Sequence, residues 1–161
     1  QTKLAGMSAA TFTPAKEELK KDNRAKALRV YLEKNNSPFA GSAETFVESA
    51  DKYDLDWKFV AAIAGLESGF GKHIPYNSYN AWGWGVYGTN VHYFSSWDDG
   101  ITTVSTQLRT KYMDKWGATN VYEIGSYYAA DPKWAYKVTN FMNKIEAFEK
   151  SYVSTELSIS I

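Results

Sequence analysis

Residues 59–72 spell FVAAIAGLESGFGK, and this stretch decides the fold of the chain. Its large apolar residues recur in steps of 4, 3 and 4, a spacing that predicts one amphipathic helix: Phe59, Ile63, Leu66 and Phe70. Asp56 precedes the stretch as a predicted N-cap. Gly69 and Gly71 are predicted to stop the helix, because glycine adopts the left-handed conformation that ends helices.

Glu67 is the single acidic residue of this stretch, and no Asp or Glu follows it between Ser68 and Trp97. It lies on the shoulder of the apolar stripe, in the last turn, where the negative end of the helix dipole disfavours a carboxylate. Desolvation would add to that effect and favour the neutral acid, which general-acid catalysis requires. The alternative is that Glu67 faces water or pairs with Lys72.

Residues 71–95 show neither a helical nor a strand period, and they are rich in Trp, Tyr, Asn and Gly. We expect an irregular lobe with short extended or β pieces. Trp and Tyr combine a flat apolar face with a polar group, which suits a sugar with its apolar face and its hydroxyls. A tight hairpin that packs on itself is the alternative.

The rest of the chain predicts a mainly α, single-domain architecture. Residues 1–13 are expected to form a flexible arm, residues 14–150 the domain, and residues 151–161 a tail that alternates like a lone strand and is disordered or pairs with an outside partner. Helical periods and capping residues predict further helices over residues 14–36, 42–53, 96–112, 119–128 and 132–148. In the last of these, Trp134 begins the apolar stripe and is expected in the core.

Composition excludes several classes of function. Lys and Arg total 18 and Asp and Glu also total 18, so the chain lacks the basic surplus of a nucleic-acid-binding protein. The chain has no Cys, which excludes disulfides and thiolate metal sites. His73 and His92 have no metal-ligand spacing, so we expect no metal and no cofactor. No apolar run reaches the length of a membrane span.

Four motifs in order resemble a known family: ESGFGK (67–72), NAWGWG (80–85), FSSWDDGI (94–101) and YYAADPKWAYKV (127–138). The chain resembles the bacterial peptidoglycan-cleaving glucosaminidases and the related lytic transglycosylases over about residues 45–148. The resemblance implies a lysozyme-like fold and peptidoglycan glycan strands as the partner. It also implies a protein exported to the periplasm, the cell wall or the medium, which we expect to be monomeric.

The resemblance also implies roles for individual residues. Glu67 corresponds to the catalytic acid of the family, and Tyr128 is expected close to it as a second catalytic residue. Seven further residues are expected to hold the sugars: Ser68, Tyr76, Asn80, Trp82, Trp84, Tyr87 and Tyr127.

The chain departs from glycosidases that use two carboxylates about 5–9.5 Å apart, because the lobe after Glu67 lacks an acid. A single acid is the lytic transglycosylase pattern, in which the 6-hydroxyl of the sugar closes an anhydro ring, and this is the expected reaction. A hydrolase of the same fold, completed by a distant acid such as Asp98 or Asp131, is one alternative. A non-catalytic glycan-binding module and a helical interaction domain are the others. Asp98 and Asp99 are expected to cap a helix.

Overall fold

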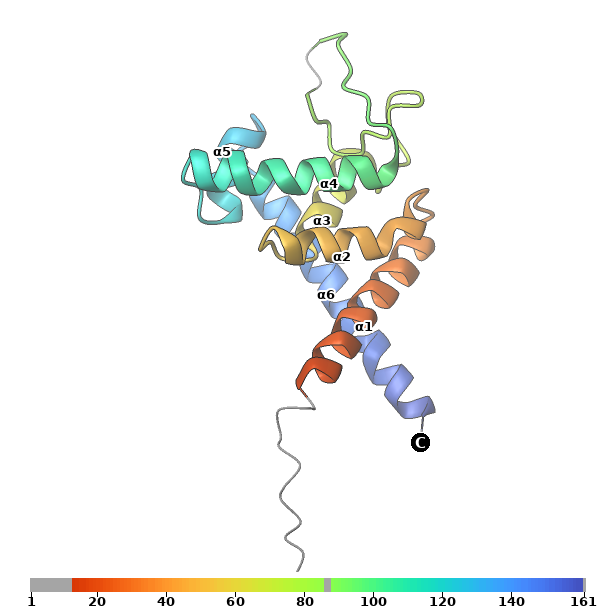
Figure 1. The fold of residues 1–161 in the computed structure, drawn as a ribbon. Coiled ribbons are helices and arrows are strands. Elements are labelled where there is room, and N and C mark those ends of the chain that lie inside the picture. Colours follow the sequence, from red (N-terminus) through yellow and green to blue (C-terminus); the bar gives the residue numbers. More distant parts are fainter. Residues whose placement is uncertain (1–12, 86–87, 161) are drawn as a thin grey trace, which may run out of the picture.

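The computed structural model describes residues 13–85 and 88–160, with side chains from residue 23 onward, and shows a mainly helical protein (Figure 1). This confirms the expected fold class. Among the described residues, no helix is long and apolar enough to cross a membrane. In chain order the helices are α1 (Thr13–Lys34), the 3₁₀-helix η2 (Ala40–Ser42), α2 (Ala43–Lys52), α3 (Phe59–Ser68), α4 (Trp97–Gln107), the π-helix η3 (Leu108–Lys115), α5 (Val121–Tyr128) and α6 (Trp134–Ile159).

Helix α3 forms the centre of the core. Its residues from Phe59 to Gly65 are all buried. The helix is thus enclosed on every side and not only along the predicted stripe, because the residues between the stripe positions are also small or apolar. It packs most extensively against α6, and also touches α2 and α4. Gly65 permits the close approach, because a Cβ there would lie 2.9 Å from Phe141 Cδ1 on α6 and 2.7 Å from Phe70 Cζ.

Helices α3 and α6 begin in the same way. The side chain of Asp56 accepts a hydrogen bond from the Lys58 amide at 2.9 Å, and that of Asp131 accepts one from the Lys133 amide at 2.9 Å. Each Asp thus closes a turn ahead of the helix, so both helices start slightly later than the capping pattern predicts.

The fourth predicted helix continues across a change of helix type. Ser96 caps α4 as expected, accepting a hydrogen bond from the Asp99 amide at 3.0 Å. The helix then widens into the π-helix η3, which carries Leu108 and Tyr112 of the predicted stripe. Local π-helical geometry is rare and concentrates at functional sites.

The lobe between α3 and α4 is irregular, as expected, and projects beyond α4 in Figure 1. Its described residues form turns and bends and contain no strand. Asn80 organises this segment from inside. Its side-chain amide donates to the carbonyl oxygens of Trp84 (2.7 Å) and His92 (3.0 Å), and its oxygen accepts from the Trp84 amide (2.9 Å).

The expectation of a strand-like or disordered tail is wrong for residues 151–159, which continue helix α6. Figure 1 shows the end of α6 extending past its crossing with α1. Ser154, Thr155 and Ser158 each donate a hydroxyl hydrogen bond to the carbonyl four residues earlier. A lone strand leaves its backbone groups without partners, whereas a helix pairs them internally. Of the expected arm at residues 1–13, residues 1–12 lie outside the described part of the chain and Thr13 begins α1.

Candidate active site

Glu67 lies in the last turn of α3, and its two carboxyl oxygens have different surroundings. Oε1 accepts a hydrogen bond from the indole Nε1 of Trp134, at 2.7 Å. Oε2 lies beside Gly83, where a Cβ would be 3.7 Å from it. Among the described residues, no Lys or Arg forms an ion pair with Glu67, so the expected alternative of a salt bridge with Lys72 is wrong.

The surroundings of Glu67 favour its neutral form. The residue as a whole is exposed, but desolvation by nearby protein atoms raises the pKa of its carboxyl group above the ordinary value, and the Trp134 hydrogen bond opposes part of that rise. Desolvation raises the pKa because a neutral carboxyl group loses less hydration than a charged one, and it is the larger of the two effects. The direction agrees with the expectation drawn from the sequence.

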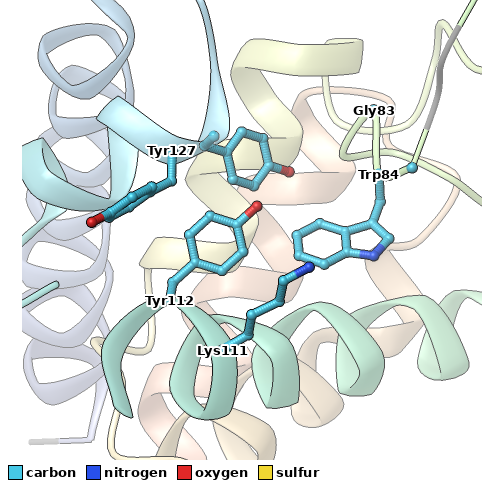
Figure 2. Close-up of a pocket in the computed structure, with 7 residues that line it drawn as sticks. Gly83, Trp84, Lys111, Tyr112 and Tyr127 are labelled. Atoms are coloured by element: carbon cyan, nitrogen blue, oxygen red, sulfur yellow. The ribbon is translucent and has the colours of Figure 1, made fainter. Parts of the chain in front are cut away.

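A cleft of about 390 Å³ is lined by Gly83, the residue that adjoins Glu67 Oε2, while Glu67 itself is not among its lining residues. Figure 2 shows Lys111 and Tyr112 of η3 extending toward Trp84 of the lobe, with Tyr127 of α5 turned to the outer side. Seven residues line it: Gly83, Trp84, Gly85, Lys111, Tyr112, Tyr127 and Tyr128. Gly83 has φ +62, a conformation that a larger residue adopts with strain, and its lack of a side chain keeps the space next to Glu67 Oε2 open.

Tyr128 connects the cleft to the carboxyl group. Its ring stacks on Trp134 with centroids 4.7 Å apart, and its hydroxyl donates to the carbonyl of Trp82 at 2.7 Å. Burial raises the pKa of Tyr128 well above its ordinary value, and the charges of Glu67 and Tyr112 raise it further. Tyr128 therefore remains a neutral hydrogen-bond donor near Glu67.

Three residues expected to hold sugars are instead buried. Ser68, Asn80 and Trp82 are 4%, 2% and 0% exposed, so their side chains offer no surface to a ligand. Ser68 Oγ accepts from the Gly71 amide at 2.8 Å and lies 2.7 Å from the Ala81 carbonyl oxygen, and Trp82 Nε1 donates to the Val60 carbonyl at 3.0 Å. Ser68 and Trp82 thus hold the lobe against α3 and Asn80 bonds within the lobe, because a buried polar group needs an internal partner.

The remaining expected sugar-binding residues have different positions. Trp84 and Tyr127 line the cleft, which agrees with the expectation without testing sugar contact. Tyr76 is 87% exposed and is not among the lining residues. Tyr87 lies outside the described residues.

Asp98 and Asp131, the acids expected as distant partners, have other partners, as does Asp99, which was expected to cap a helix. Asp98 accepts a hydrogen bond from Thr45 at 2.7 Å, Asp99 one from the Ser95 amide at 2.9 Å, and Asp131 one from Lys137 at 2.6 Å. No neighbouring charge contributes to the pKa of Glu67. Among the described residues, no Asp or Glu lines the cleft, and Glu67 adjoins it at the lining residue Gly83. No described group of three His, Cys, Asp or Glu side chains could hold a metal ion.

Trp134 is a site residue that sequence reasoning missed. Its burial was predicted, and it is 2% exposed, but its hydrogen bond to Glu67 spans 67 positions of sequence. A buried Trp needs an acceptor for its N–H, and this requirement was the signal available. The spacing of residues along the sequence could not identify Glu67 as the acceptor for the Trp134 N–H.

Comparison with known proteins identifies the family of this chain. The family described as mannosyl-glycoprotein endo-beta-N-acetylglucosaminidase matches residues 43–147. This match covers well over half of the chain, so the chain belongs to that glucosaminidase family. The matched region includes Glu67, the lobe, Tyr128 and Trp134.

Two relatives of this chain carry similar names. A Streptococcus pneumoniae serotype 4 protein named "Putative endo-beta-N-acetylglucosaminidase" is 29% identical over 120 residues, which is 69% of this chain and 18% of that protein. A Bacillus subtilis protein named "Beta-N-acetylglucosaminidase" is 25% identical over 142 residues, 70% of this chain and 16% of that protein. The chain therefore spans less than a fifth of the length of these relatives.

Proposed function

We propose that this glucosaminidase-family chain cleaves the β-1,4 glycan backbone of bacterial peptidoglycan, with Glu67 as its general acid and then its general base. The observation that carries the proposal is a desolvated carboxyl group beside an aromatic cleft, with one oxygen held and the other next to the open space at Gly83. Such a substrate requires a protein exported to the cell wall.

The two oxygens of Glu67 suggest how the proton is placed. An oxygen that accepts the Trp134 N–H is suited to be the carbonyl oxygen of the neutral acid, so Oε2 carries the proton on the cleft side. Oε2 donates this proton to the glycosidic oxygen as the bond to C1 breaks. A fixed donor reduces the loss of orientational freedom in the transition state.

The lone carboxyl group favours help from the substrate in the next step. The acetamido group of the sugar stabilises the positive charge at C1. The 6-hydroxyl oxygen then attacks C1 and returns its proton to Glu67, leaving an anhydro ring and a regenerated acid. Tyr128 acts as a positioning residue in this scheme, because its hydroxyl holds the Trp82 carbonyl next to Gly83.

Hydrolysis is the second candidate reaction, and the names of the two relatives, both glucosaminidases, favour hydrolysis. In that case water attacks C1 in place of the 6-hydroxyl, and Glu67 accepts the proton from water. The acetamido group can stabilise the cation in either reaction, so a second carboxylate is not needed.

The test is digestion of purified peptidoglycan by the wild-type chain and by Glu67→Gln. Gln keeps the shape and an acceptor for Trp134 but has no acidic proton, so the rate should fall by about 10²–10⁴. Glu48→Gln, at an exposed residue of α2 away from the cleft lining, is the matched control. Full activity in Glu67→Gln would refute the assignment of the acid.

Mass analysis of the wild-type products distinguishes the candidate reactions. Anhydro ends are lighter by one water than hydrolysed ends, so the anhydro product is expected and the hydrolysed product would select the second candidate. Binding without any cleavage would instead identify a non-catalytic glycan-binding module.

A further inference from the structure

One charged side chain lines the cleft, and the reaction scheme does not use it. Of the seven described lining residues, six are uncharged and the seventh is Lys111. Its side chain extends from η3 toward Trp84 in Figure 2. Among the described residues it forms no ion pair, although Asp114 on the same helix pairs with Arg109 at 3.8 Å.

The structure holds the Lys111 ammonium group at the cleft without neutralising it. Nζ lies 4.8 Å from the ring centroid of Trp116, within the range of a cation–π contact. Such a contact orients the ammonium group and leaves its hydrogen-bond donors available. The π-helical turn carries both Lys111 and its neighbour Tyr112 to the cleft. The cleft is therefore electropositive at a defined point.

Peptidoglycan differs from neutral polymers of N-acetylglucosamine in carrying carboxylates, which the Lys111 ammonium group can bind. Every second sugar of peptidoglycan is a muramic acid, whose lactyl branch ends in a carboxylate or continues into a stem peptide that carries carboxylates. N-acetylglucosamine polymers have no such group. A Lys ammonium forms charge-assisted hydrogen bonds with a carboxylate and none of that strength with a hydroxyl.

We propose that Lys111 is a specificity-determining residue that binds a carboxylate on the muramic-acid branch and so selects anionic wall glycan over neutral N-acetylglucosamine polymers. This inference rests on the proposed function for its substrate class. In this proposal, Lys111 on η3 recognises the muramic-acid branch, and Glu67 cleaves the glycan backbone.

The experiment measures binding, so it does not depend on turnover. Glu67→Gln serves as the background, with Lys111→Met and Lys111→Arg added, and Lys115→Met as the matched control because Lys115 lies on η3 but outside the cleft lining. Trp fluorescence titration gives Kd for three probes: glycan fragments stripped of peptide, fragments that retain peptide, and neutral N-acetylglucosamine oligomers.

Lys111→Met should weaken binding of a carboxylate-bearing probe by about 5- to 20-fold, the scale of a partly exposed charge-assisted hydrogen bond. Neutral oligomers should change by less than about twofold, Lys111→Arg should retain most of the affinity, and Lys115→Met should change nothing. Added salt should weaken binding to the background protein and have little effect after Lys111→Met.

Each result bears on the proposal. A loss confined to peptide-free fragments identifies the lactyl carboxylate, and a loss confined to peptide-bearing fragments identifies the stem peptide. An equal loss on neutral oligomers, no loss at all, or no binding of either carboxylate-bearing probe overturns it. Failure of the proposed function is seen separately, as absence of peptidoglycan cleavage by the wild-type chain.

Discussion

The two walls of the cleft are built differently. The catalytic wall consists of Gly83 and Tyr128, which line the cleft, backed by Glu67, Trp82 and Trp134. Three hydrogen bonds connect these residues: Trp134 to Glu67 at 2.7 Å, Tyr128 to the Trp82 carbonyl at 2.7 Å, and Trp82 to the Val60 carbonyl at 3.0 Å. Every bond joins segments far apart in sequence.

The binding wall consists of Lys111 and Tyr127, which line the cleft, and of Trp116, which both of them contact; all three residues are exposed. Ring contacts hold it, with Trp116 and Tyr127 centroids 5.0 Å apart and Lys111 over Trp116. The comparison shows a division of tasks: the wall that places a proton is rigid, as catalytic geometry requires, and the wall that meets the substrate keeps exposed groups that can adapt.

Removing a buried side chain that supports the catalytic wall should have the largest effect on the stability of the protein. Trp82→Ala removes a fully buried side chain and its bond to α3, so the free energy of unfolding should fall by about 3–5 kcal/mol. Urea denaturation measures this. The control is Tyr76→Ala, at an aromatic residue of the same lobe that is 87% exposed, whose free energy of unfolding should stay within about 0.5 kcal/mol of wild type. Equal losses of stability in the two variants would contradict the supporting role of Trp82.

Removing the hydrogen bond to Glu67 should have an intermediate effect, mainly on catalysis. Trp134→Phe keeps an aromatic ring but leaves Oε1 without its donor, so the rate of glycan cleavage should fall by about 10- to 100-fold through misplacement of the carboxyl group. Rates and thermal stability should be measured together, because a loss of stability alone would indicate only a packing role.

The same variant makes a prediction about pH. The Trp134 hydrogen bond lowers the pKa of Glu67, so its removal should raise that pKa further. A general acid acts while protonated, and activity is lost as pH rises through its pKa. The alkaline limb of the pH–rate profile should therefore move to higher pH in Trp134→Phe, and an unmoved limb would exclude this role.

The smallest effect is expected at Tyr128, at the edge of the catalytic wall. Tyr128→Phe retains the stacking on Trp134 and removes only the hydroxyl hydrogen bond to Trp82. The free energy of unfolding should fall by about 0.5–1.5 kcal/mol, with a modest loss of activity. A loss as large as that of Glu67→Gln would instead give the hydroxyl a direct part in the reaction.

Several features of the fold and site were predictable because their causes are local. The steps from Phe59 to Phe70 and the glycines after them identified α3 and its end, and Ser96 marked the start of α4. Local spacing also placed Glu67 at a helix end. The prediction failed for the tail, where a few alternating residues suggested a strand that has no partner to pair with.

The amino-acid sequence by itself determined the helical pattern, the position of the one acid in residues 65–85 and the absence of another before Asp98. Only the tertiary structure decided which side chains surround that acid. It brought Trp134 to Glu67, buried Trp82 and Asn80 inside the lobe instead of presenting them to sugar, and turned Lys111 into the cleft. The reason is physical: spacing along a chain encodes which face of a helix is apolar, whereas a hydrogen bond across 67 positions depends on how whole helices pack.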